Sequence, residues 1–175
     1  MIIDIIRHTK VYNPKNLCYG HFEIPLAETS QSDIHQASGQ VADQYSAVFT
    51  SPSHRTSALA QGLQRGLVLP EPRLKEMNFG SWEGRPWDAI SRDELDLWAK
   101  DIVNYIPPGG ESFQQVADRA QSFLKSIQHI GYDSVLLVTH KGTIWSMLSY
   151  LKSKSLDEAM TIDVAYGQLF RFAIP

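Results

Sequence analysis

The chain has 175 residues, of which 43% are hydrophobic and 20% charged, a composition close to that of average soluble globular domains. This composition excludes a disordered or collagen-like chain, and the length allows one domain to bury a core without disulfides or a structural metal. The formal net charge is −3, and the 16 Lys and Arg residues are scattered along the chain. We therefore expect no binding to nucleic acid.

Cysteine content and hydrophobic runs bear on where the protein acts. Cys18 is the only cysteine, so no disulfide can form within the chain, and a reducing, cytoplasmic location is favoured. The first six residues carry no basic residue ahead of their apolar run, unlike a signal peptide. Apolar runs elsewhere fall far short of the ~20 residues that span a bilayer, so no membrane association is predicted.

The first half of the chain alternates between strand and helix patterns. Residues 2–6 form a β-branched apolar run, typical of a strand buried on both faces. From Ser30 onward, apolar residues recur at helical spacing as far as Tyr45, and Ser30 with Asp33 resembles a capping pair. Residues 47–50 predict a second buried strand. The apolar face of a following helix consists of Ala58, Leu59, Leu63 and Leu67.

The second half begins with a short strand, predicted at residues 73–75. Residues from about 77 to 110 then form an excursion of loops and short helices, because this segment contains several Gly and Pro residues. The remaining predicted elements are a helix at 111–130, a buried strand at 135–139, a helix at 142–151 and a last strand at 168–174.

Alternating strands and helices predict a single α/β domain over residues 1–175. Its expected architecture has three layers, with helices on both faces of a mostly parallel sheet. In such sheets ligands bind beyond the carboxyl ends of the strands. The residues that immediately follow each strand are therefore the first candidates for a functional site.

Reactive side chains follow four of the predicted strands. Arg7 and His8 follow the first strand, Arg55 the second, Glu76 the third and His140 the fourth. Two arginines and two histidines suit an anion, and the guanidinium fork matches phosphate oxygens. Histidine can act as a nucleophile, and a nearby carboxyl can protonate a leaving oxygen, so the set suffices for covalent phosphoryl transfer.

Simpler interpretations exist for each residue alone. His140 could be a hydrogen-bonded residue at a strand end, and Glu76 an exposed carboxylate. Their coincidence at the edge where ligands bind favours a site instead. A metal centre is the competing interpretation, but the six histidines show no His-x-His or His-x-x-x-His spacing and there is one cysteine. No metal and no other cofactor is predicted.

At these positions the sequence resembles the histidine phosphatase superfamily, also called phosphoglycerate mutase-like, over nearly the whole chain. Residues 7–9 resemble its Arg-His-Gly motif, residues 51–55 its Ser-Pro-x-x-Arg motif, and His140 with Gly142 its second histidine motif. More narrowly, residues 74–84 and 108–112, together with Tyr19-Gly20 and Pro25-Leu26, are similar to the alpha-ribazole phosphatase branch. The resemblance implies a phosphoglycerate mutase-like fold.

The resemblance also implies roles for the residues that match. His8 would attack phosphorus and become phosphohistidine, and Glu76 would be the proton donor. Arg7, Arg55 and His140 would bind the phosphate. Further expected substrate contacts are Thr9, Asn13, Gly20, Lys141 and Trp82.

Three of these positions depart from the family pattern. Thr9 replaces the usual Gly and could offer a hydroxyl to the phosphate, and Lys141 stands where Gly is frequent and could add positive charge. Asn13 lies one place before the position of the family's asparagine, which is Pro14 here. The excursion at about 77–110 is expected to lie over the active site. Tryptophan is concentrated there, and Trp82, Trp87 and Trp98 could stack on a heteroaromatic base.

The leading hypothesis is a metal-independent phosphomonoesterase that acts on alpha-ribazole 5′-phosphate during assembly of the cobalamin nucleotide loop. The alternative is a broad-specificity or sugar-phosphate phosphatase, which would use the same chemistry. A mutase is less favoured because the mutases of this superfamily are longer. A non-catalytic binding module would normally have lost His8 or Glu76. The expected partner is a phosphorylated small molecule, and the choice between a monomer and a homodimer stays open.

Overall fold

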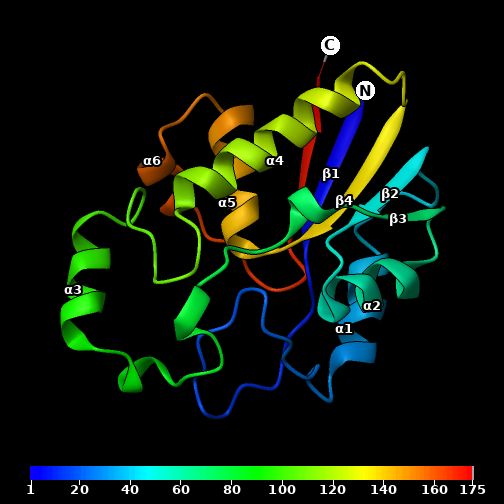
Figure 1. The fold of residues 1–175 in the computed structure, drawn as a ribbon. Coiled ribbons are helices and arrows are strands. Elements are labelled where there is room, and N and C mark those ends of the chain that lie inside the picture. The colour runs from blue at the N-terminus through cyan, green and yellow to red at the C-terminus, as the bar shows by residue number, and fades with distance from the viewer. Residues whose placement is uncertain (175) are drawn as a thin grey trace.

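The computed structural model describes residues 1–174, which contain one five-stranded sheet (Figure 1). The strands are β1 (Ile2–Arg7), β2 (Ala47–Thr50), β3 (Val68–Pro70), β4 (Ser134–Thr139) and β5 (Leu169–Ala173). Their order across the sheet is β3-β2-β4-β1-β5. Neighbouring strands are parallel except β5, which pairs antiparallel with β1. The prediction of a mostly parallel sheet is confirmed.

Helices cover both faces of this sheet. α4 (Phe113–Gln128) and α5 (Lys141–Leu151) pack on one face, where their apolar residues share a core with Ile3 and Leu137. α1 (Ser30–Ser38) and α2 (His54–Leu63) pack on the other face, against Ile6 and Leu136. Successive strand residues alternate between the two faces, so a continuous apolar strand serves both cores. The predicted three-layer α/β/α architecture is therefore confirmed.

The longest helix begins where its side chains satisfy the free backbone groups of its first turn. The Ser112 hydroxyl accepts a hydrogen bond from the Gln115 N–H, and the Gln115 side chain accepts one from the Ser112 N–H. Such a capping box fixes the start of a helix. The helix predicted at 111–130 accordingly runs from Phe113 to Gln128, and a short α6 (Leu156–Met160) packs beside α5.

The prediction of a short strand at residues 73–75 is wrong. The third strand is Val68–Pro70, and η1 (Pro72–Leu74) is a 3₁₀ turn. Proline at the first helical position is preorganised for a helix, and the Glu71 carboxylate accepts the Arg73 N–H. Local capping therefore outweighs strand propensity here.

Two predicted helices end earlier than expected. α1 ends at Ser38, before Gly39, although Val41 and Tyr45 stay buried in the loop that follows. α2 ends at Leu63, because Gln64 adopts the left-handed conformation with φ 53°. Leu67 therefore lies outside the helix, and 72% of its surface is exposed.

The excursion lies beside the sheet and has a small core of its own (Figure 1). It contains η2 (Gly80–Trp82), η3 (Trp87–Ala89) and α3 (Arg92–Lys100). The core is aromatic and includes a residue of the early loop; its buried members are Cys18, Trp82 and Ile90. Within the part of the chain described, no helix is both long and apolar enough to cross a membrane.

Candidate active site

Two histidines and an arginine follow the central strands and lie at one edge of the sheet. His8 follows β1, His140 follows β4, and Arg55 lies in the first turn of α2 after β2. Because β2, β4 and β1 are adjacent and parallel, their carboxyl ends lie side by side. The two imidazole rings are 5.2 Å apart between centroids.

His8 is held as a neutral ring with one free nitrogen. Its Nδ1 lies 2.7 Å from the carbonyl oxygen of Thr9. A carbonyl only accepts hydrogen bonds, so Nδ1 carries the proton and Nε2 keeps its lone pair. Burial, then the charges of Arg55 and Arg7, hold the pKa of His8 well below its usual value. Nε2 is therefore ready to act as a nucleophile.

His140 is also buried and is oriented by a neighbouring hydroxyl. Its Nε2 lies 2.8 Å from Ser51 Oγ, and its Nδ1 has no hydrogen-bond partner. Burial, followed by the positive charge of Arg55, lowers the pKa of His140 well below its usual value. When the Ser51 hydroxyl donates to Nε2, the ring proton lies on Nδ1, which can then donate to an anion.

Both arginines are fixed by carbonyl oxygens and aromatic rings. Arg55 is fully buried and donates from Nη2 to the carbonyl of Gly20 at 2.6 Å. Arg7 donates from Nη1 to the carbonyl of Val164 at 2.7 Å, and its guanidinium lies 3.8 Å from the ring centroid of Tyr166. The carbonyl and ring contacts leave the positive charges in place, and the Glu23 carboxylate is no closer to Arg55 Nη1 than 3.9 Å, so both guanidinium groups remain available to an anion.

Several polar atoms around His8 are buried without a partner. They are Arg7 Nε, Arg55 Nε, Thr9 Oγ1 and His140 Nδ1. An unsatisfied buried polar group costs about 1–3 kcal/mol, and native proteins keep few of them. A phosphate group has several acceptor oxygens and a negative charge, so it would satisfy the donors of this set. The set therefore indicates an anion site at His8.

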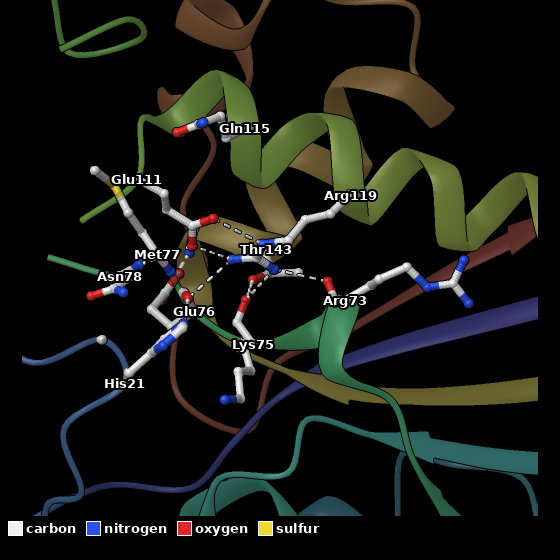
Figure 2. Close-up of polar contacts among 12 residues, drawn as sticks. His21, Arg73, Lys75, Glu76, Met77, Asn78, Glu111, Gln115, Arg119 and Thr143 are labelled. Carbon is white, nitrogen blue, oxygen red and sulfur yellow. Dashed lines mark hydrogen bonds and ion pairs between the residues drawn. The ribbon is translucent and has the colours of Figure 1, made fainter. Parts of the chain in front are cut away.

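Glu76 lies in the loop that follows η1 (Figure 2). Its carboxylate accepts the Met77 N–H at 3.0 Å and the Gly142 N–H at 3.1 Å. A Cβ atom at position 142 would lie 2.5 Å from Glu76 Oε1, so the glycine makes this approach possible. The start of α5 and the loop of Glu76 are thus fitted to one another.

One cavity of about 310 Å³ contains His8, Arg7 and Glu76. Its remaining wall is dominated by apolar and aromatic side chains, among them Phe79, Trp87, Trp98, Phe113, Trp145 and Met160. Trp87 and Trp98 stack with an interplanar angle of 20°. Ligand sites of this size combine an apolar wall with a few polar groups. The cavity therefore offers an aromatic compartment next to the anion site.

The family model of the histidine phosphatase superfamily (branch 1) matches residues 3–174. The chain belongs to this superfamily. The alpha-ribazole phosphatase from Shigella flexneri superposes with a TM-score of 0.89 and is 27% identical, covering 100% of this chain and 91% of that one. These similarities confirm the phosphoglycerate mutase-like fold and the assignment to a phosphatase family.

Two curated relatives with similar sequence identity to this chain bear different names. The adenosylcobalamin/alpha-ribazole phosphatase of Escherichia coli K12 is 29% identical over 165 residues, which are 86% of this chain and 79% of the relative. A protein of Cronobacter sakazakii named "Probable phosphoglycerate mutase GpmB" is 28% identical over 157 residues, 84% of this chain and 73% of the relative. Membership of the superfamily therefore supports a phosphatase without naming the substrate.

Six of the residues expected for a histidine phosphatase lie around the site: Arg7, His8, Thr9, Arg55, Glu76 and His140. Lys141 also lines the cavity, where its Nζ lies 4.8 Å from the ring centroid of Trp145. Gly20 acts through its backbone: its carbonyl holds Arg55, and a Cβ there would lie 1.7 Å from the Met77 carbonyl oxygen.

Two expected substrate contacts lie elsewhere. Trp82 is fully buried in the core of the excursion, its Nε1 donates to Glu94 at 3.1 Å, and it is not among the residues that line the cavity. Trp87 and Trp98 line the cavity instead. The Asn13 side chain bonds both backbone groups of Leu17, at 3.0 and 2.8 Å, and shapes its own loop.

Other residues of the site were not expected from the sequence. Tyr166 covers Arg7, lies 5.5 Å from the His8 ring and shares a 3.0 Å hydrogen bond with the hydroxyl of Tyr19. It lies in the loop before β5, where no periodic pattern marks it. Ser51 belongs to the Ser-Pro-x-x-Arg motif, but its contact with His140 depends on the pairing of β2 with β4. Among residues 1–174, no three His, Cys, Asp or Glu side chains are grouped to hold a metal ion.

Proposed function

We propose that this protein is a metal-independent phosphomonoesterase that works through a phosphohistidine. The observation that carries the proposal is the neutral His8 ring, which keeps a free Nε2 and lines one cavity with Glu76 and Arg7. Nε2 attacks phosphorus, and the bond from phosphorus to the alcohol oxygen breaks. Glu76 gives its proton to that oxygen, so the alcohol leaves neutral.

The second half of the reaction regenerates the enzyme. Water attacks the phosphorus of phosphohistidine, and the Glu76 carboxylate accepts a proton from that water. The bond from phosphorus to nitrogen breaks, the electron pair returns to His8 Nε2, and inorganic phosphate leaves. Arg7, Arg55 and His140 bind the phosphoryl oxygens throughout, which replaces the charge neutralisation that metal ions give other phosphoryl-transfer enzymes.

The proposed substrate is alpha-ribazole 5′-phosphate, as in assembly of the cobalamin nucleotide loop. Its base is flat and heteroaromatic, and the compartment beside the anion site is lined by the stacked rings of Trp87 and Trp98. Structural similarity to an alpha-ribazole phosphatase supports the same choice. The buried thiol of Cys18, which is not in a disulfide, supports action in the cytoplasm.

Phosphate release from a panel of substrates tests the proposal. The panel contains alpha-ribazole 5′-phosphate, ribose 5-phosphate, phosphoserine and 3-phosphoglycerate, each assayed with EDTA present and with His8→Ala as the blank. We expect turnover in EDTA, with kcat/KM for alpha-ribazole 5′-phosphate at least ~10-fold above the others, since one aromatic pocket separates substrates by 1–3 kcal/mol. Equal values would indicate a broad-specificity phosphatase. Movement of phosphate within phosphoglycerate would indicate a mutase, and a requirement for a divalent metal would contradict the mechanism.

A further inference from the structure

A half-buried arginine outside the cavity binds the backbone that carries Glu76. Arg119 extends from α4 toward the segment between η1 and Glu76 (Figure 2). Its Nη1 donates to the carbonyl of Arg73 at 2.8 Å and to that of Lys75 at 2.6 Å, and its Nη2 donates to the carbonyl of Glu76 at 3.0 Å. Three carbonyl oxygens within four residues thus share one guanidinium.

The same guanidinium also forms an ion pair with the carboxylate of Glu111. Arg119 Nε donates to Glu111 Oε2 at 3.2 Å, and Nη2 lies 2.7 Å from Glu111 Oε1. The Glu111 carboxylate also accepts the Asn78 N–H at 2.9 Å. The Arg119–Glu111 pair therefore contacts the backbone on both sides of Glu76, at residues 73–76 and at Asn78.

Threonine hydroxyls from the sheet and α5 complete the support of this segment. Thr139 Oγ1 donates to the carbonyl of Leu74 at 2.6 Å, and Thr143 Oγ1 donates to that of Lys75 at 2.7 Å. The segment has no regular secondary structure after Leu74, so these side chains determine its path. A reacting group displaced by about 1 Å can lose about 10²-fold in rate, which makes such support consequential for an acid.

We propose that Arg119, held by Glu111, is the positioning residue for the proton donor of the reaction. It fixes the backbone of Glu76 so that the carboxyl meets the leaving oxygen of the substrate, and it touches no substrate itself. The inference rests on the proposed function. Lysine cannot replace Arg119, because an ammonium group has no planar fork to reach three carbonyl oxygens and a carboxylate at once.

Alkyl and aryl phosphates separate positioning from folding. An alkoxide needs a proton to leave, whereas an aryl oxide needs it much less, so a misplaced Glu76 slows only the alkyl ester. Phosphoenzyme formation is measured in single turnovers for Arg119→Gln and Arg119→Lys with ribose 5-phosphate and 4-nitrophenyl phosphate. We expect both variants to lose about 30-fold on the alkyl ester and less than about 3-fold on the aryl ester, consistent with a small displacement of the acid.

Arg73→Gln is the matched control. It removes a guanidinium from the same segment, where Arg73 pairs with Glu71 at 2.7 Å, but leaves the carbonyl contacts of Arg119 in place. Its alkyl-to-aryl ratio should equal that of the wild type. Glu111→Gln keeps a neutral partner for Arg119, so it serves if the Arg119 variants do not fold; a loss of about 5-fold, again confined to the alkyl ester, is expected.

A double variant tests whether the loss of activity in the Arg119 variants is transmitted through Glu76. If Arg119 acts through Glu76, adding Arg119→Gln to Glu76→Gln causes no further loss on the alkyl ester. Equal losses on alkyl and aryl esters, or additive losses in the double variant, would overturn the positioning role. Failure of the proposed function looks different: no phosphoenzyme forms in the wild type, or Glu76→Gln alone shows no dependence on the leaving group.

Discussion

The rings of His8 and His140 lie edge to face because each follows the last paired residue of two neighbouring strands, β1 and β4. Arg7 on β1 pairs with Thr139 on β4, so the residues that follow these two also lie side by side. The His8 N–H donates to the Thr139 carbonyl at 3.0 Å, which extends the pairing one residue beyond the strands. The resulting 5.2 Å separation of the ring centroids places two buried imidazoles beside Arg55, which raises the cost of protonating either ring.

This arrangement predicts that the protein loses stability in mild acid. The pKa values of His8 and His140 are lowered in the folded state, so between those values and about 6.5 the unfolded chain binds protons that the folded protein does not. The free energy of unfolding should therefore fall as the pH drops below about 6.5, by at most about 1.4 kcal/mol per pH unit for each histidine, and should show no such dependence above pH 7.5.

Urea unfolding between pH 5 and pH 8 measures this dependence. His8→Gln and His140→Gln should each flatten the acid side of the stability curve. His129→Gln, which changes an exposed histidine after α4, should leave the curve as in the wild type. Identical slopes in the wild type and the two buried-site variants would show that these rings do not titrate as described.

A second prediction concerns the covalent intermediate. His8→Ala should lower turnover by at least about 10³-fold, since losing the nucleophile removes the covalent route. Rapid acid-free quenching with ³²P-labelled substrate should trap a base-stable, acid-labile phosphoenzyme in the wild type. The variant should form none. His54→Gln, which alters an exposed histidine next to Arg55, is the control and should be labelled like the wild type. Labelling of His8→Ala would assign the nucleophile to another residue.

Much of the site could be predicted because apolar strands end abruptly at reactive residues. His8, Arg55 and His140 follow runs whose burial on both faces is evident from composition, and parallel pairing brings such strand ends together. The choice among tryptophans could not be predicted. Trp82 and Trp98 lie in the same aromatic core, but only Trp98 also lines the cavity, a difference that depends on the packing of the whole excursion and not on local spacing.

The Arg119–Glu111 pair shows a second limit of sequence analysis. The Glu111 carboxylate is engaged by Arg119 and by the Asn78 N–H, so it is not free to serve as the proton donor in place of Glu76. Glu83 is similarly engaged, since it accepts the N–H groups of His21 and Phe79 at 2.9 Å. The contacts of Glu111 with Asn78 and of Glu83 with His21 join residues that are 33 and 62 positions apart, so they follow from the tertiary fold and not from local spacing.

The third prediction separates the acid role of Glu76 from binding. Glu76→Gln keeps the shape of the side chain but cannot give up a proton, so esters with poor leaving groups should be slowed by about 10²-fold or more. Aryl phosphates should lose much less in the step that forms the phosphoenzyme. Single-turnover rates for ribose 5-phosphate and 4-nitrophenyl phosphate measure the difference. Equal losses on both would remove Glu76 from the acid role.

The last prediction uses the contact between Gly142 and Glu76. Position 142 lies in α5 without a positive φ, so alanine suits the helix and should raise its intrinsic stability by up to about 1 kcal/mol. The new Cβ would meet Glu76 Oε1 at 2.5 Å. The end of a flexible side chain moves at little cost, so the carboxyl should shift while the fold stays intact. Gly142→Ala should therefore preserve or increase the unfolding midpoint and slow alkyl phosphates by ~10-fold or more, with aryl phosphates little affected.

Gly39→Ala, where the added Cβ meets only the Gln36 carbonyl oxygen at 3.6 Å, is the control for an added methyl group. A Gly142→Ala enzyme with wild-type rates on alkyl phosphates would mean that the placement of the Glu76 carboxyl against α5 does not govern proton donation.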